Sequence, residues 1–237
     1  MTQQFAAVEP HGSLVPIIND VWYVTGSVAF KPLVRLPRNM VVVRHQGELT
    51  LINAVRLDEG GKAELDALGK VAHVMRIGFH AMDDAYYLDQ YAAKLWVVAG
   101  TGAQASNASI GELSEDTTLP FPDSRVFIFK KTIRPEAAIL IDRDGGLLIT
   151  CDSVQHWAPS TLMSPMAKVL TRLIGFQKPA QIGPPWRKKQ TPQGASLLPD
   201  FERLAALPFN QLICGHGGLL KKAAAAQLAV SIDRELR

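Results

Sequence analysis

The chain is 237 residues long, with 47% hydrophobic and 20% charged residues, an ordinary composition for a globular protein. This composition excludes intrinsic disorder, coiled coils and collagen-like chains, and it predicts a substantial hydrophobic core. The 25 Lys and Arg residues outnumber the 22 Asp and Glu residues only slightly, and they are scattered along the sequence. So small an excess of positive charge does not predict a nucleic-acid partner.

The sequence shows no signal for export or for a membrane span. The N-terminus has neither the basic nor the apolar region of a signal peptide, and no window approaches about 18 uninterrupted apolar residues. The two cysteines, Cys151 and Cys214, form no Cys-x-x-Cys pair and fit a reducing compartment. We therefore expect a cytoplasmic protein without a membrane partner, built as one domain over residues 1–237.

The first half of the chain predicts strands that alternate with helices. Residues 20–26 predict an edge strand, and residues 40–55 contain two β-branched runs around a Gly-containing turn, which is typical of a hairpin. A short helix at 62–68 precedes a buried strand at 71–77, and residues 83–99 repeat this pair. Such alternation predicts parallel strands in this half.

The second half predicts another sheet with its own helices. Its predicted strands are 125–130, 138–141, 147–151 and 211–214. Its predicted helices are 166–174, one from residue 199, and one from residue 219 onward. The proline-rich stretch 178–199 predicts a long surface loop or a lid, with Trp186 and Arg187 as the candidate lid residues. Two halves of this kind indicate two sheets covered by helices.

Three of the six histidines stand in loops that directly follow a predicted strand, namely His80, His156 and His216. Carboxylates accompany two of them, because Asp84 follows His80 by four residues and Asp152 precedes His156 by four. Loops at strand ends converge, so these side chains form a candidate site. Imidazole with carboxylate suits zinc, iron or manganese. The alternatives are a helix cap at Asp84 and turn binding at Asp152.

The order of these elements, with two short phrases, resembles the metallo-β-lactamase superfamily. The phrases are Leu-Ile-Thr-Cys-Asp152-Ser and Leu-Ile-Cys-Gly-His216-Gly, and the resemblance runs from the hairpin near Met40 to the C-terminal helix. It implies an α/β fold, a four-layer αββα sandwich of two mixed sheets. It also implies a metal site made of His80, Asp84, Asp152 and His216.

The metal-binding motif of that family is incomplete in this chain. The motif His-x-His-x-Asp-His would lie over His80 to Ala85, where Met82 replaces the second His and Ala85 the last. A further metal His of the family corresponds to Arg134, whose charge would oppose a divalent cation and could instead pair with one of the site aspartates. The surviving ligands can support one ion, with His156, Arg134 and Met82 beside it in the pocket.

Two functions follow from the resemblance. In the first, the chain is a metal-dependent hydrolase with one zinc, iron or manganese ion, and Asp84 is the candidate catalytic base. In the second, the metal chemistry has decayed, and the chain is a metal-free ligand-binding or interaction protein on the same fold. The expected partner is a small molecule in either case. An exposed face of the C-terminal helix would also allow a homodimer.

Overall fold

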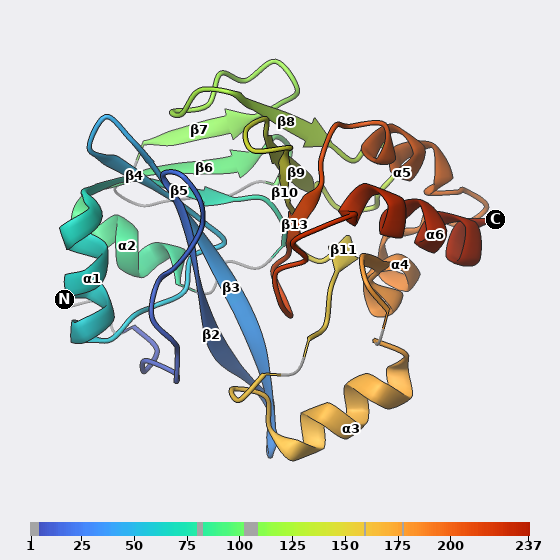
Figure 1. Ribbon diagram of the computed structural model, residues 1–237, viewed down its shortest axis with the longest axis horizontal. Coiled ribbons are helices and arrows are strands. Elements are labelled where there is room, and N and C mark those ends of the chain that lie inside the picture. Colours follow the sequence, from blue (N-terminus) through green and yellow to red (C-terminus); the bar gives the residue numbers. More distant parts are fainter. Residues whose placement is uncertain (1–4, 80–82, 102–108, 159, 177) are drawn as a thin grey trace.

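Two β-sheets lie face to face in the computed structural model, and helices cover the outer face of each sheet (Figure 1). The structure describes residues 5–79, 83–101, 109–158, 160–176 and 178–237. Both sheets contain parallel and antiparallel strand pairs. The expected four-layer αββα sandwich of two mixed sheets is therefore confirmed.

The first sheet has seven strands that follow the order of the sequence. They are β1 (Val15–Ile18), β2 (Val21–Lys31), β3 (Val34–His45), β4 (Glu48–Ile52), β5 (Lys70–Arg76), β6 (Lys94–Val98) and β7 (Ile110–Leu113). The predicted hairpin is β3–β4, and Gln46 and Gly47 form its turn with φ of 50° and 80°. The prediction of an edge strand at 20–26 is wrong, because β1 pairs with the outer side of β2.

The second sheet has four strands in the order β13 (Gln211–Ile213), β10 (Leu147–Ile149), β9 (Ala137–Ile141) and β8 (Ser124–Ile128). Strands β9 and β10 pair antiparallel, and β10 and β13 pair parallel. A separate two-stranded ribbon joins β11 (Val154–Gln155) to β12 (Gln181–Ile182). The sequence did not predict this ribbon, β1 or β7, because runs of two to four residues carry little periodicity.

Helices α1 (Glu59–Leu68) and α2 (Asp84–Tyr91) cover the first sheet. Helices α4 (Pro184–Gln190), α5 (Leu198–Ala205) and α6 (Ala224–Leu236) cover the second. The proline-rich stretch therefore contains a helix, since Pro184 and Pro185 occupy the first turn, where proline costs no hydrogen bond. In the described ranges, no helix has the length and apolar character needed to cross a membrane.

The core between the sheets consists of side chains that point inward from both. Val43 and Met75 come from the first sheet, and Ile139, Ile149 and Ile213 come from the second, all of them buried. Separate buried clusters lie under the outer helices of each sheet. Because both faces of each sheet are covered, strands such as β9 are apolar at every position, and this made them recognisable from the sequence.

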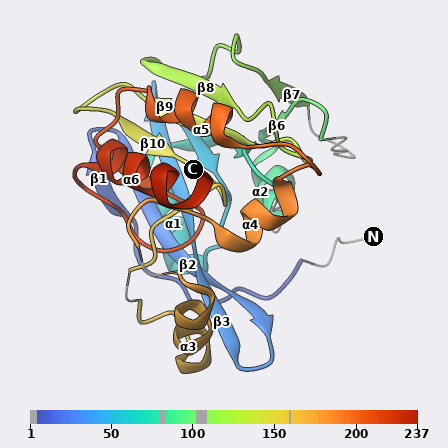
Figure 2. The same ribbon diagram turned by 90° about the vertical axis from the view of Figure 1, so that its right-hand side faces the viewer.

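Helix α3 (Pro165–Ile174) lies outside the sandwich, against the long hairpin of β2 and β3 (Figures 1 and 2). Its N-cap is Ser164, whose hydroxyl accepts a hydrogen bond from the backbone N–H of Ala167. The same hydroxyl donates to the carbonyl oxygen of Leu33 at 2.7 Å and accepts from the N–H of Arg35 at 3.1 Å. A single serine therefore caps the helix and fastens it to the hairpin.

Candidate functional site

The loops that follow β5, β10 and β13 meet at one end of the sandwich. Gly78, after β5, lies so close to Cys151 that a Cβ at this position would come within 2.5 Å of Sγ. Gly215, after β13, donates its N–H to the carbonyl oxygen of Cys151 at 3.0 Å. Cys151 and Cys214 are both free and buried, and burial raises the pKa of each thiol. The cysteines therefore belong to the packed floor of this junction.

His216 and Asp152 face each other at the junction, with Nε2 of His216 at 3.4 Å from Oδ1 of Asp152. Nδ1 of His216 lies 2.8 Å from the carbonyl oxygen of Pro37. Because a carbonyl oxygen only accepts, Nδ1 carries the proton and Nε2 points toward the carboxylate. Such a hydrogen bond fixes the orientation of imidazoles that act as ligands or bases. The structure thus brings these two predicted site residues together.

Two residues that the sequence did not single out complete this arrangement. Gln155 donates from Nε2 to Oδ1 of Asp152 at 3.2 Å, and its Oε1 accepts from Nε1 of Trp157 at 2.7 Å. The indole of Trp157 stacks on the ring of His216, with centroids 5.9 Å apart and planes 5° from parallel. The four side chains form a closed circuit, so each one limits the movement of the others.

Asn39, on β3, holds the loop that carries His216. Its Nδ2 donates to the carbonyl oxygens of Cys214 at 2.8 Å and Gly217 at 3.0 Å, and its Oδ1 accepts from the hydroxyl of Thr25. Gly217 has a φ of 98°, and a Cβ there would come within 2.1 Å of a neighbouring carbonyl oxygen. The sequence pointed to this glycine-flanked turn. It gave no signal for Asn39, a single amide in a strand of mixed composition.

Asp84 is engaged by Arg76, a residue of β5 that the sequence analysis did not identify. Nε of Arg76 lies 2.6 Å from Oδ2 of Asp84, whose side chain is 3% exposed. Burial raises the pKa of Asp84, and the guanidinium of Arg76 opposes that rise. Asp84 is the first residue of α2, and its carboxylate points to Arg76 instead of capping the helix.

Arg134 does not form the predicted ion pair with a site aspartate. Its guanidinium lies over the ring of Phe79, 3.9 Å from the centroid, and both residues are exposed. Within the described part of the chain it has no carboxylate partner. Arg76 takes the role that the sequence analysis gave to Arg134, because a strand residue adjacent to the loop reaches Asp84 directly.

The other residues predicted to lie at or beside the metal are His80, Met82 and His156. His80 and Met82 lie outside the described residues. His156 is half-buried and donates its backbone N–H to Sγ of Cys214 at 3.1 Å. Burial lowers the pKa of its imidazole, and among the described residues Nδ1 has no hydrogen-bond partner. Burial therefore disfavours the charged form of His156, which lies next to the loop of His216.

The prediction that Trp186 and Arg187 form a lid is wrong. Trp186 is 7% exposed, packs edge-on against Phe129 and donates from Nε1 to Glu136 at 2.6 Å. Arg187 donates to the carbonyl oxygen of Glu235 in α6. The prolines that suggested a loop instead begin α4, and the helix turns its tryptophan into the core.

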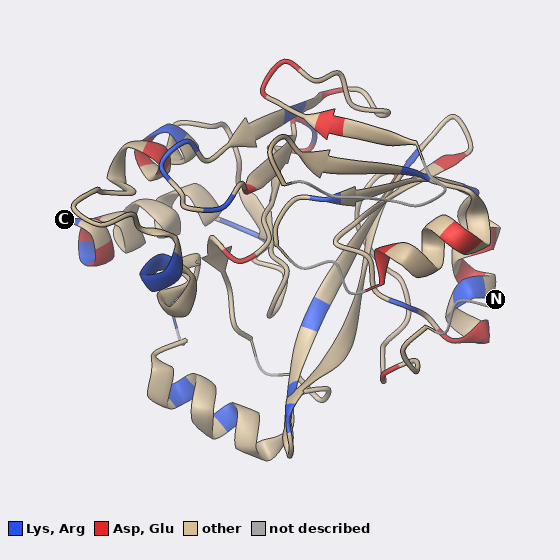
Figure 3. Cartoon of the chain, turned by 180° about the vertical axis from the view of Figure 1, so that it is seen from behind, with Lys and Arg blue, Asp and Glu red and all other residues tan. Residues whose placement is uncertain are grey.

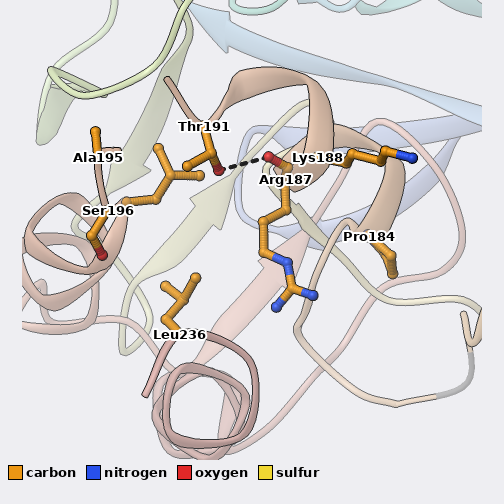
Figure 4. Close-up of a pocket in the computed structure, with 8 residues that line it drawn as sticks. Pro184, Arg187, Lys188, Thr191, Ala195, Ser196 and Leu236 are labelled. Carbon is orange, nitrogen blue, oxygen red and sulfur yellow. Dashed lines mark hydrogen bonds between the residues drawn. The ribbon is translucent and has the colours of Figure 1, made fainter. Parts of the chain in front are cut away.

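Arg187 also lines an open hollow of about 510 Å³ between α4, the start of α5 and the end of α6 (Figure 4). The hydroxyl of Thr191 in its wall donates to the carbonyl oxygen of Arg187 at 2.7 Å. Of the predicted site residues that the structure describes, Arg187 alone lines this hollow. The hollow is therefore separate from the junction of the strand-end loops.

Glu136 is a buried acid at the junction that sequence reasoning missed. Its carboxylate accepts hydrogen bonds from Nε1 of Trp186 and from the backbone N–H of Ser153 at 2.9 Å. Burial, with a smaller contribution from the charge of Asp152, raises the pKa of Glu136 to about 7. It gave no sequence signal because its partners are 17 and 50 residues away.

The described residues do not fit the complete metal site that the resemblance implied. No cluster of three or more His, Cys, Asp or Glu side chains in the described ranges has the arrangement of a metal site. Of the implied ligands, His216 and Asp152 face each other, whereas Asp84 is paired with Arg76. A guanidinium within hydrogen-bond distance supplies the positive charge that a carboxylate ligand would otherwise receive from a metal.

Solved metallo-β-lactamases share this architecture over nearly their whole length. The DIM-1 metallo-β-lactamase has 10% identity, a TM-score of 0.63, and coverage of 97% of this chain and 99% of its own. FIM-1 from Pseudomonas aeruginosa, in its mono-zinc form, has 14% identity, a TM-score of 0.61 and coverage of 96% of both chains. The enzyme from Erythrobacter litoralis has 12% identity, a TM-score of 0.60, and coverage of 93% and 92%. The chain has the metallo-β-lactamase fold.

Identities of 10 to 14% show a common metallo-β-lactamase fold and not a common reaction. No sequence-family model matches the chain, and no curated protein sequence matches it. The chemistry of this metallo-β-lactamase-like protein must therefore be argued from its own side chains.

The ion pair of Arg76 and Asp84 allows a direct test. We expect Arg76→Gln to lower the free energy of unfolding by about 3 kcal/mol, because it leaves a buried carboxylate without its partner. The double variant Arg76→Gln, Asp84→Asn should recover most of this loss. Urea unfolding of both variants measures the difference. Arg125→Gln, which removes an exposed pair with Asp142, is the control and should cost less than about 1 kcal/mol.

An equal loss in the single and double variants would contradict this explanation, since the cost would then come from packing of the arginine stem.

Glu136 predicts a pH dependence of stability. Because its pKa is about 7 in the folded protein and 4.5 ordinarily, the folded state binds more protons between these values. The unfolding free energy should therefore fall as pH rises through this window, by roughly 3 kcal/mol in total. Glu136→Gln keeps an acceptor for Trp186 and should remove this fall. Urea unfolding at about pH 5 and about pH 8 compares the two proteins; parallel curves would show that Glu136 is ionised throughout.

Proposed function

We propose that this chain is a small-molecule-binding protein on the metallo-β-lactamase fold, and that its site works without a catalytic metal. The observation that carries this proposal is the ion pair of Arg76 with Asp84 at 2.6 Å. It neutralises, inside the protein, a carboxylate that the resemblance assigned to a metal. Losing this ligand leaves Asp152 and His216 as the facing pair at the junction.

The chemistry of the ligand follows from the side chains that remain partly exposed there. Asp152 and His216 have side-chain exposures of 20% and 16%, so both have contact with solvent. Asp152 offers an acceptor, and the half-buried Trp157 offers a flat aromatic side chain. Sites of this kind bind small molecules through a few placed polar groups and an apolar wall. We therefore favour a small ligand with a hydrogen-bond donor and a planar group. A cytoplasmic location is part of the same proposal.

The second candidate is a metal-dependent hydrolase with a single zinc, iron or manganese ion. The observation that favours it is the hydrogen bond from His216 to Pro37, which turns Nε2 toward Asp152 as in a metal-binding imidazole. FIM-1, of the same fold, has a mono-zinc form. This candidate needs at least one further ligand, and His80 is the predicted residue for that position.

Metal content separates the two candidates. We expect protein purified without a metal-affinity step to contain far less than one zinc, iron or manganese ion per chain. Adding each metal should leave the melting temperature unchanged, because a ligand that binds the folded state raises it. The measurements are elemental analysis and thermal unfolding, on the wild type and on Asp152→Ala, His216→Ala.

The matched control is His45→Ala, Asp142→Ala, which removes the same residue types outside the candidate site. A stoichiometric ion that is present in the wild type and the control, but lost in Asp152→Ala, His216→Ala, would contradict the proposal and establish the hydrolase candidate.

A further inference from the structure

Half of the exposed large apolar side chains in the described part of the protein lie on one projecting arm. The arm consists of the β2–β3 hairpin tip, residues 29–35, and α3 with its cap, residues 164–174 (Figures 1 and 2). Its exposed apolar residues are Phe30, Leu33, Met166, Val169, Leu173 and Ile174. Leu33 and Leu173 are 82% and 78% exposed. A concentration of this kind marks an interaction surface.

Helix α3 divides its residues sharply between a buried face and an exposed apolar stripe. Ala167 and Thr171, four residues apart, are its buried residues and face the hairpin. Met166, Val169 and Leu173 are spaced by three and four residues, so they form one stripe on a different face, and all three are exposed. The apolar stripe of the helix therefore does not pack against the body of this protein.

The hairpin tip keeps a leucine where folding disfavours it. Leu33 occupies the turn between β2 and β3 with a φ of 64°. Glycine or asparagine suits this left-handed conformation, and a residue with a larger side chain costs about 1 kcal/mol there. Leu33 gains no compensating burial within the protein, because its side chain points into solvent. Packing within the protein therefore does not explain this side chain, whereas contact with a partner would.

The tip and the helix form one continuous surface. Besides the hydrogen bonds of Ser164, a groove of about 450 Å³ runs between them and is lined by Ala29, Leu33, Pro165 and Met166 among others. The exposed leucine of the hairpin and the first exposed residue of the helical stripe thus share one groove.

The arm is also positively charged. From Ser153 to Pro199, a span of 47 residues, the chain has six Lys or Arg and no Asp or Glu. Figure 3 shows α3 with basic positions and no acidic ones. The exposed cations of the arm are Lys31, Arg35, Lys168 and Arg172. One acid approaches them, since Glu9 lies 3.6 Å from Arg35. Apolar side chains beside exposed lysines and arginines complement an anionic surface.

We propose that the arm docks this protein on the surface of an anionic lipid bilayer. The apolar stripe of α3 and the tip leucine enter the headgroup region, and the flanking cations lie near the lipid phosphates and carboxylates. A protruding apolar edge suits a bilayer, which deforms around it, better than it suits a rigid protein groove. The sequence expectation of no membrane partner depended on the absence of a long apolar run, and a surface-bound helix of ten residues needs no such run.

Vesicle sedimentation with the full chain tests this proposal. We expect binding to vesicles of phosphatidylcholine with phosphatidylserine, little binding to phosphatidylcholine alone, and a fall in binding as salt is added. Val169→Gln should weaken binding about tenfold, since it removes one buried apolar side chain. Its matched control is Val230→Gln on α6, because both valines are 55% exposed. Lys168→Gln, Arg172→Gln should lose about fivefold for each charge.

Leu33→Asn separates docking from folding. Asparagine tolerates a positive φ, so this variant should keep or raise the melting temperature while it weakens vesicle binding about tenfold. Three results would overturn the proposal: no binding to phosphatidylserine vesicles, equal binding of the arm variants and the wild type, or a homodimer in solution that Val169→Gln dissociates. The last result would show that a second copy of the chain covers the arm.

Discussion

Burial of apolar side chains between the two sheets determines where the loops of this protein can lie. Met75 on β5 and Ile149 and Ile213 on the second sheet are packed in one cluster, so the loops that follow β5, β10 and β13 emerge together. Their polar groups then need partners inside the protein. Asn39 satisfies two carbonyl oxygens of the last loop. Every feature of the candidate site depends on this shared packing.

The features that the sequence predicted are those with a local signal, such as an apolar run or a glycine-containing turn. The continuous apolar run of β9, the Gln46-Gly47 turn and the Gly-His-Gly loop of His216 each carry their signal within a few residues. The partners of the site are not local. Trp186 reaches Glu136 across 50 residues, and Arg76 was one of many cations that could have paired with Asp84. Tertiary packing selects such pairs, so a single sequence does not reveal them.

Donors of the protein itself meet each carboxylate at the junction. Asp84 has Arg76, Asp152 accepts from Gln155, and Glu136 accepts from an indole N–H and a backbone N–H. Divalent cations bind where carboxylates are left to share a positive charge. Here protein donors already meet those carboxylates, although the backbone is that of metallo-β-lactamases. A common fold does not by itself determine the local chemistry.

The aromatic ring of Phe176, which follows α3, connects the arm with the candidate site. Phe176 lies 5.0 Å from Trp157, centroid to centroid, and Trp157 stacks on His216. Anything that holds α3 in place therefore also restrains Trp157 in the candidate site. Thermodynamic linkage then makes the effect mutual: if attachment of the arm strengthens ligand binding by some factor, the ligand strengthens attachment by the same factor. The cellular concentration of the ligand would in that way govern where the protein resides.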